Sequence, residues 1–353
     1  MSEKNFELAC PLPHRHDTVQ LAHGGGGRLS REIVETIFRP RFGESSQKQR
    51  HDSAVFDAPG KRLAFTTDGY VVKPMFFPGG DIGKLAVIGT INDLAMAGAW
   101  PHALSVSFIL EEGLPFVDLE RIVNSMGLAA RTAGVDIVTG DTKVVDKGKG
   151  DGVFITTTGV GRVPEGIFIG PEQVRPGDTI LVSGDVGRHG IAVLSAREGL
   201  QLEGPIESDC APLHEMVRVL LDAGVEMHCL RDPTRGGLSA VLNEVAEDAR
   251  MDIEIDERAV PIGEVVRGAC ELFGLDPLYV ASEGRLVAFI PEHESDRALM
   301  LIRSRADGAQ AQCIGRVVGP APASRPGRVT LRGRLGTTRL LDLFAGEQLP
   351  RIC

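Results

Sequence analysis

The pattern of apolar and polar positions predicts alternating strands and helices over the first half of the chain. Alternation in residues 61–72 (KRLAFTTDGYVV) predicts a strand, and the apolar spacing of residues 81–99 predicts a helix packed on a sheet. A strand at 103–110, a helix at 115–134 that stops at Gly134, and strands at 135–145 and 152–163 follow. The order β-α-β-α-β-β indicates an α+β layer domain.

A second unit with a similar mixture of elements follows the turn sequence RPGD. We expect a strand at 179–183, helices at 187–199 and 211–224, and a strand, turn and helix within 226–250. A helix at 263–274, a strand through 278–291, a helix at 294–306 and strands near 313–319 and 327–332 complete the pattern. The predicted organisation is a flexible segment (1–50), two α/β domains (51–165 and 172–340) and a mobile tail (341–353).

Composition and charge narrow the class of protein. The chain has 353 residues, 42% of them apolar and 24% charged, with a net charge of -10, which is typical of a globular protein with two domains. The acidic balance argues against nucleic acid as a partner. We find no run of membrane-spanning length and no apolar leader, and six scattered cysteines suit a reducing compartment, so we expect a cytoplasmic protein.

Three aspartates lie near glycines or at the ends of predicted elements. Asp68 is in TTDGY, Asp93 is in INDLA inside a predicted helix, and Asp141 precedes Thr142 and Lys143 in TGDTK. Carboxylate oxygens are the ligands that Mg²⁺ prefers, usually shared with phosphate. A turn or cap role is equally open for Asp68 and Asp141. Asp93 lies among apolar residues and needs a partner more clearly.

Glycine-rich turns supply candidate phosphate donors. HGGGGR contains Gly24, Gly25, Gly26 and Gly27, a run that either wraps phosphates or serves as a linker. No GK[ST] follows it, so it is not a P-loop.

The turn RDPTRGG, which carries Asp232 and Arg235, opens a predicted helix. Its amides and Arg235 can meet an anion, or Asp232 can simply cap the helix.

Two further residues are candidates for chemistry. Glu283, in the predicted strand around ASEGR, is either a general base or the partner of Arg285 in a salt bridge. Cys353 is the last residue and carries a thiol at the end of the predicted tail. Chance accounts for a terminal cysteine as readily as a function does, because termini tolerate most residues.

The order of these motifs resembles the HypE family of carbamoyl dehydratases. HGGGG, TTDGYVV, FFPGGDIGKLAVIGTINDLAMAGA, VTGDTKVV, SGDVGRHG, RDPTRGGL, ASEGR and the terminal PRIC carry the resemblance, which runs from about residue 18 to the end. This family belongs to the superfamily of aminoimidazole ribonucleotide (AIR) synthetase, also called PurM-like. The resemblance implies two PurM-like domains and a homodimer whose N-terminal sheets pair into a β-barrel.

The resemblance also implies a reaction and its residues. The carbamoyltransferase HypF would load a carbamoyl group on Cys353, and the chain would use ATP to dehydrate it to a thiocyanate. The cyano group would pass to iron on the HypC–HypD complex and become a ligand of the [NiFe]-hydrogenase centre. Asp68, Asp93 and Asp141 would hold Mg²⁺. Lys143 and Glu283 would lie beside the tail as the two candidates for the catalytic base, with steering of phosphate as the other role for Lys143. The other implied nucleotide-binding residues are Gly24, Gly25, Gly26, Gly27, Thr142, Asp232 and Arg235.

Two alternatives remain open at the level of sequence. One is a small-molecule kinase or synthetase of the same superfamily, for which Cys353 would be dispensable. The other is a dimeric maturation adaptor without catalysis, whose terminal cysteine only docks on partners.

Overall fold

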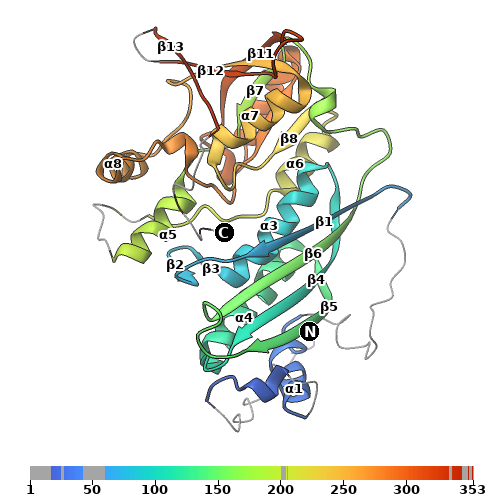
Figure 1. The fold of residues 1–353 in the computed structure, drawn as a ribbon. Coiled ribbons are helices and arrows are strands. Elements are labelled where there is room, and N and C mark those ends of the chain that lie inside the picture. The colour runs from blue at the N-terminus through green and yellow to red at the C-terminus, as the bar shows by residue number, and fades with distance from the viewer. Residues whose placement is uncertain are drawn as a thin grey trace, which may run out of the picture.

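The structure is a computed structural model that describes residues 17–24, 28–42, 60–199, 204, 206–333, 336–343, 349 and 352. It contains two mixed α and β units, which lie at opposite ends of the molecule in Figure 1. The first described elements are η1 (Leu21–Gly24), α1 (Arg28–Ile33) and the π-helical turn η2 (Val34–Phe38). Gly25, Gly26, Gly27 and Cys353 lie outside the described residues.

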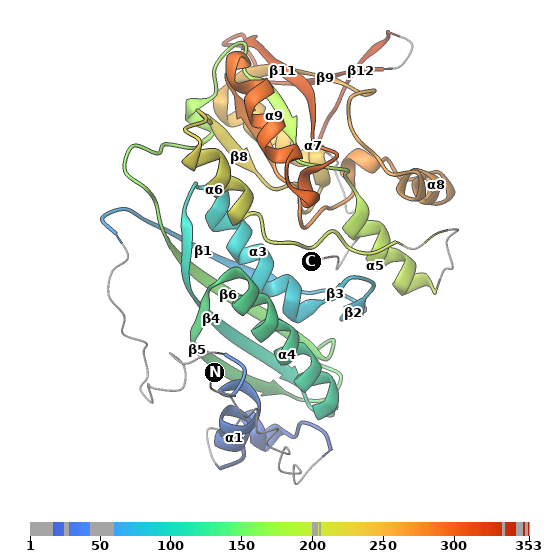
Figure 2. The same ribbon diagram turned by 180° about the vertical axis from the view of Figure 1, so that it is seen from behind.

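The N-terminal unit is a four-stranded sheet covered on one face by two helices. The strand order is β1-β6-β4-β5, with only β4 and β5 parallel. Helices α3 and α4 lie on the same face, which Figure 2 turns toward the viewer. The bounds are β1 (Leu63–Tyr70), α3 (Ile82–Met96), β4 (Trp100–Glu111), α4 (Phe116–Ala133), β5 (Asp136–Val145) and β6 (Val153–Arg162), with a small hairpin of β2 (Phe76–Phe77) and β3 (Gly80–Asp81).

Helix α3 is the central element of this unit. Asp81 caps it by accepting hydrogen bonds from the backbone N–H groups of Gly83 and Lys84. Nearly all of its side chains are buried, because the sheet lies on one side, α4 on another and α6 of the second unit on a third. Asp93 is therefore held on a rigid helix next to both units.

The C-terminal unit is a seven-stranded sheet of order β13-β12-β9-β11-β7-β10-β8. Its strands are β7 (Thr179–Val182), β8 (Cys229–Arg231), β9 (Met251–Asp256), β10 (Val287–Ile290), β11 (Gln312–Pro320), β12 (Val329–Arg332) and β13 (Thr338–Leu340). Its helices are α5 (Arg188–Glu198), α6 (His214–Asp222), α7 (Gly237–Ala249), α8 (Glu264–Phe273) and α9 (Ser295–Arg303). Short 3-10 turns are η3 (Pro171–Gln173), η4 (Pro277–Tyr279), η5 (Glu292–Glu294) and η6 (Ala306–Gly308).

The predicted order of elements in the first unit is confirmed, but the long strand predicted through residues 278–291 is wrong. Only Val287–Ile290 pairs as β10, and Pro277–Tyr279 forms the 3-10 turn η4. Asp276 stabilises that turn by accepting a hydrogen bond from the Leu278 N–H. Glu283 consequently lies in a loop rather than within a strand.

The second face of the four-stranded sheet is not covered by any described helix. Side chains at alternate positions of β1 and β4 point to this face, and several are large and apolar. Leu63 is 50% exposed, Phe65 75% and Ile109 40%. Leu63 and Phe65 lie at one end of this face and Ile109 lies at the other, with Thr67, Thr158 and Ser107 between them. None of the described helices is long and apolar enough to cross a membrane.

Candidate active site

Acidic side chains from both units surround one small cavity. It has a volume of about 50 Å³ and lies where β1 and α3 meet two loops of the C-terminal unit. The residues that line it are Asp68, Gly69, Tyr70, Gly89, Asp93, Asp232, Thr234, Arg235 and Glu283. Five predicted site residues, Asp68, Asp93, Asp232, Arg235 and Glu283, are thus brought together by the fold.

Strand β1 and helix α3 place Asp68 and Asp93 on the same side of the sheet. Alternate residues of β1, including Thr66, Asp68 and Tyr70, face α3. The Thr66 hydroxyl donates a 2.8 Å hydrogen bond to Asp93 Oδ2, and the Gly69 N–H donates a 2.7 Å bond to Asp68 Oδ1. Each carboxylate keeps at least one oxygen for another ligand.

The close approach of β1 and α3 requires a glycine at position 89. A Cβ added there would lie 2.3 Å from the Tyr70 hydroxyl oxygen, so any larger residue would displace the tyrosine. Tyr70 is 2% exposed, and its hydroxyl lies 3.3 Å from Thr90 Oγ1. Gly89 thereby fixes the floor of the cavity.

The C-terminal unit contributes Asp232 and Arg235 through the turn before α7. Gly236 and Gly237 both have positive φ, 76° and 62°, which reverses the chain at the start of the helix. The N-cap of α7 is Gly236, and no side chain caps it, so the alternative role of Asp232 as a cap is wrong. Asp232 faces the cavity instead.

Glu283 is held by its backbone while one side-chain oxygen has no partner. Its N–H donates to Asp209 Oδ1 at 3.1 Å, and its carbonyl accepts a 3.2 Å bond from the Asn92 amide. Glu283 Oε1 is buried without a hydrogen-bond partner. Arg285 bonds Asp185 Oδ1 at 2.6 Å, so the predicted alternative of a Glu283–Arg285 salt bridge is wrong.

The electrostatics of the cavity favour a bound cation. Burial raises the pKa of Asp93, and burial together with the charge of Asp93 raises the pKa of Asp232 to about 7. Burial and the charges of Asp232 and Asp209 hold the pKa of Glu283 well above its usual range. A cation would relieve this repulsion and would satisfy the unpartnered Glu283 oxygen, so the donor set fits Mg²⁺. Among the described residues no three such side chains stand at metal-ligand spacing, so the ion would share them with phosphate oxygens.

Asp141, Thr142 and Lys143 lie away from this cavity, on β5 at the opposite edge of the sheet. The register pairs Asp141 with Ser107 of β4, Ser107 with Thr156 of β6, and Thr156 with Gly69 of β1. This row faces the uncovered side of the sheet, and three strand spacings correspond to about 14 Å. Asp141 and Lys143 form an exposed ion pair of 3.0 Å. One chain does not bring Asp141 to Asp68 and Asp93, and its role as a metal ligand stays a prediction.

Ile352, the last described residue, is buried near the junction of the two units. Ile352 is 3% exposed and belongs to the apolar cluster of the N-terminal unit, together with Val193, Cys210 and Ala281. His189 Nε2 lies 2.9 Å from the Ile352 carbonyl oxygen. The N–H of the next residue, Gly190, donates a 3.0 Å bond to the Ala281 carbonyl, two residues before Glu283, so Ile352 lies near the loop that carries Glu283.

Sequence reasoning missed His189, Ser208 and Asp209. His189 lies in SGDVGRHG, which attracted notice only as a glycine turn, and no spacing in the sequence links it to a residue 163 positions away. Ser208 and Asp209 lie in the segment that crosses between the units, where polar residues read as an ordinary loop.

Comparison with known proteins places the chain in a family. Residues 50–163 match the family described as AIR synthase related protein, N-terminal domain, and residues 175–324 match the corresponding C-terminal domain. The chain is 52% identical over 342 residues to the carbamoyl dehydratase HypE of Azotobacter vinelandii, covering 97% of this chain and 99% of the relative. The chain belongs to the HypE family.

Solved HypE structures share this architecture. A hydrogenase maturation protein HypE in complex with ATP is 46% identical, with a TM-score of 0.90 over 95% of this chain and 99% of that one. A HypE–HypF complex matches at 43% identity with a TM-score of 0.77 over 90% of this chain and all of the other. The predicted fold class of two PurM-like domains is confirmed, as is the predicted enzyme class, a dehydratase.

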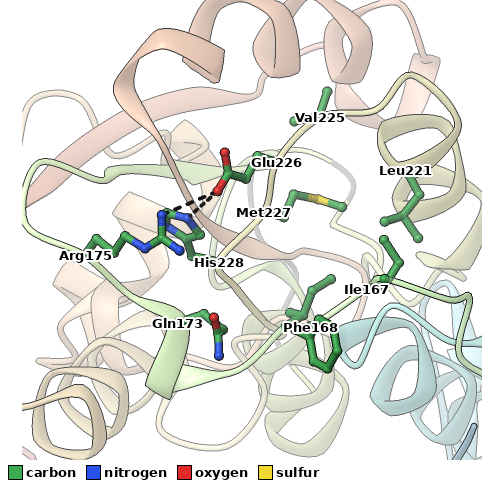
Figure 3. Close-up of a pocket in the computed structure, with 11 residues that line it drawn as sticks. Ile167, Phe168, Gln173, Arg175, Leu221, Val225, Glu226, Met227 and His228 are labelled. Atoms are coloured by element: carbon green, nitrogen blue, oxygen red, sulfur yellow. Dashed lines mark hydrogen bonds and ion pairs between the residues drawn. The ribbon is translucent and has the colours of Figure 1, made fainter.

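A second cavity of this HypE-family chain lies apart from the acidic one. Figure 3 shows it between the segment that joins the two units and the stretch before β8. Its volume is about 220 Å³. Its polar wall contains Arg175, Glu226 and His228, and its apolar wall contains Phe168 and Met227. His228 Nε2 lies 3.0 Å from Glu226, and its Nδ1 lies 2.8 Å from Asp178, so both ring nitrogens are bonded. Arg175 and Glu226 on the polar wall already form an ion pair with each other.

Proposed function

We propose that the chain dehydrates a carbamoyl group carried on its own terminal Cys353, with ATP as the phosphoryl donor. The product is a thiocyanate on Cys353, which supplies the cyanide ligand of the iron centre in [NiFe]-hydrogenase. The observation that carries the proposal is the burial of Ile352, the neighbour of Cys353, against His189, whose neighbour Gly190 bonds the loop that holds Glu283. The relatives named carbamoyl dehydratase and the relative solved with ATP support it.

The chemistry has to convert a poor leaving group into a good one. The carboxamide oxygen of Cys353–S–CO–NH₂ attacks the γ-phosphorus of ATP, and ADP departs. The nitrogen then loses its remaining protons while the C–O bond breaks and phosphate leaves, giving Cys353–S–C≡N. Such a reaction needs a fixed geometry, neutralised phosphate charge and a base within reach.

Glu283 is the base that this chain offers. It lines the acidic cavity, and its Oε1 has no hydrogen-bond partner in the described residues, so this oxygen is available to accept a proton. Arg235 lines the same cavity and can pair with phosphate. Asp68, Asp93 and Asp232 would hold Mg²⁺, which when bound offsets the charge of the transferring phosphoryl group.

We further propose that two copies pair through the uncovered faces of their four-stranded sheets and close a barrel. The exposed Phe65, Leu63 and Ile109 support this, and so does the location of Asp141 and Lys143 on the same face. In such a dimer these two residues would reach a nucleotide site only from the second copy. Phe65→Glu should shift the chain toward monomer in sedimentation velocity.

A matched control is available for this test of the dimer. Val117→Glu, a change at a 71% exposed position on the opposite, helical side of the unit, should leave the oligomeric state unchanged. Equal sedimentation of the Phe65→Glu variant and the unmodified chain would contradict pairing through this face.

The proposed partners are the carbamoyltransferase HypF, which would load Cys353, and the HypC–HypD complex, which would receive the cyano group. A relative of 43% identity was solved in complex with HypF, which supports the first of these. We place the reaction in the cytoplasm, in keeping with the free cysteines Cys210, Cys229, Cys270 and Cys313 among the described residues.

Intact mass spectrometry tests the reaction. The chain is first loaded by HypF with carbamoyl phosphate and ATP. The loaded chain is then freed of nucleotide and measured before and after Mg²⁺-ATP is added. A carbamoyl adduct on Cys353 should form and then lose the mass of one water. Cys353→Ala should abolish both species. Full ATP turnover by Cys353→Ala on a free small molecule would instead establish a superfamily kinase, and a stable adduct without ATP turnover would establish an adaptor.

A further inference from the structure

A single side chain binds the backbone one residue before the reactive end of the chain. His189 Nε2 lies 2.9 Å from the carbonyl oxygen of Ile352, and the carbon of that carbonyl is bonded directly to the nitrogen of Cys353. His189 itself has no exposed surface. The contact is therefore fully shielded from water, where a hydrogen bond is strong and its loss is costly.

The direction of this hydrogen bond follows from the partners. A carbonyl oxygen only accepts, so Nε2 carries the hydrogen and donates it to Ile352. In the neutral ring Nδ1 is then an acceptor, and it lies 2.8 Å from the Ser208 hydroxyl, which donates to it. Ser208 Oγ in turn accepts a 3.1 Å bond from the Cys210 N–H. One tautomer satisfies the whole chain of bonds from Cys210 to Ile352.

The residues around His189 belong to both units and are tightly packed. The ring of His189 meets Phe77 of the β2–β3 hairpin edge to face, with centroids 5.3 Å apart. The Ser208 N–H donates a 2.8 Å bond to the Pro78 carbonyl. A Cβ on Gly79 would lie 2.8 Å from the Ser208 nitrogen, so glycine is needed for this approach. The imidazole is thus a fixed point on α5, held by the N-terminal unit.

The next position of α5 is adapted to the tail as well. A Cβ on Gly190 would lie 3.3 Å from Leu349 Cδ1 and 2.5 Å from Val280 Cγ1. The helix therefore approaches both the tail and the segment before Glu283 without a side chain between them. Ile352 is buried, and it belongs to the same apolar cluster as Val193 and Ala281.

We propose that His189 is a positioning residue, whose Nε2–H fixes the Ile352 carbonyl and so sets where Cys353 enters the active site. The inference rests on the proposed function, since it assigns a role in presenting the carbamoyl group of Cys353. His189 does not touch the reacting atoms. A displacement of about 1 Å of the reacting group lowers a rate by up to about a hundredfold, which is why a backbone clamp next to the thiol matters.

Two substitutions separate the hydrogen bond to the tail from the rest of the side chain. His189→Gln keeps an N–H₂ donor near the position of Nε2, whereas His189→Asn places its amide near Nδ1 and leaves the Ile352 carbonyl without a donor. The rate of Cys353 alkylation by iodoacetamide in the full-length chain, read from the tail peptide by mass spectrometry, should rise about three- to tenfold in His189→Asn. In His189→Gln it should stay within about twofold of the unmodified chain.

The same variants are then loaded by HypF and given Mg²⁺-ATP. His189→Asn should lose about tenfold or more in the single-turnover rate of water loss, with the KM for ATP unchanged, and His189→Gln should recover most of that rate. His228→Gln is the matched control, because this histidine is as buried and bonded through both nitrogens but lies at the second cavity. It should change neither readout.

The outcomes distinguish the inference from the proposed function. Equal rates of Cys353 alkylation in His189→Asn, His189→Gln and the unmodified chain would overturn the inference. A clear difference in alkylation without any dehydration in the unmodified chain would support the inference and reject the proposed reaction. If His189→Asn does not fold, Ser208→Ala takes its place, because it removes the partner of Nδ1 that orients the ring. An alkylation rate in Ser208→Ala equal to that of the unmodified chain would equally overturn the inference.

Discussion

The acidic cavity predicts an unusual dependence of stability on pH in protein freed of metal and nucleotide. The pKa of Asp232 is raised from 3.8 to about 7. The folded protein therefore disfavours the ionised form, so the contribution to stability is complete below about pH 4 and is lost as pH rises from about 4 to 7. At 1.36 kcal/mol per pKa unit the full loss is about 4 kcal/mol, an upper limit because part of Asp232 remains exposed.

Thermal unfolding in EDTA measures this effect. Between pH 4 and pH 8 the melting temperature of the unmodified chain should fall by up to about 8 °C through this group, at about 2 °C per kcal/mol. In Asp232→Asn the fall should be smaller by that amount, and Mg²⁺ at pH 8 should stabilise the unmodified chain more than the variant. Asp222→Asn, at an exposed position on α6, is the control and should keep the original slope. Identical slopes in Asp232→Asn and the unmodified chain would refute the electrostatic account of the cavity.

Three further predictions concern the packing around the site. Gly89→Ala should lower the free energy of unfolding by about 1–3 kcal/mol and raise the KM for ATP, because the added Cβ displaces Tyr70. Gly268→Ala on α8 is the control, since an added Cβ there meets nothing and the protein should not be destabilised. Equal melting temperatures for the Gly89→Ala and Gly268→Ala variants would contradict this reasoning. Arg285→Met should lower the free energy of unfolding in urea by about 3–5 kcal/mol, because it removes the buried cation that bonds Asp185 and lies near Asp209; Asp185 keeps its ion pair with Arg188. Burial lowers the pKa of His189, so its contribution to stability is complete above about pH 6.5 and is lost as pH falls below that value; His189→Gln should flatten the melting temperature between pH 5 and 7.

Sequence patterns predict those parts of the site whose residues lie on elements that follow one another closely in the chain. Asp68 and Asp93 line one cavity because a strand followed at once by a covering helix brings its face against that helix. Asp141 illustrates the limit. A strand presents alternate residues to opposite faces, so a one-residue difference in register decides whether Asp141 faces α3 or the open side. No pattern within residues 135–145 fixes that register.

The contacts between the two units could not be predicted from spacing. Asp232 and Glu283 reach the cavity across the junction of two sheets, and the burial of Glu283 depends on Asn92 and Asp209, which come from different units. The strand predicted through Glu283 failed because the apolar residues on either side of it alternate as in a strand, while Asp276 and Pro277 divert the chain into a turn. At Glu283, therefore, tertiary packing overrides the local propensity for a strand.

The energetics of the tail explain why one hydrogen bond can control it. Burying Ile352 contributes about 1.5–3 kcal/mol, and the bond from His189 contributes about 1 kcal/mol. Ordering two or three backbone residues costs about 1–2 kcal/mol each. These terms nearly cancel, so we expect Ile352 to exchange between a bound and a free state. The proposed function requires such an exchange, since Cys353 would be loaded by one protein and converted in another. Because the opposing terms are of similar size, the hydrogen bond from His189 is large enough to shift this equilibrium.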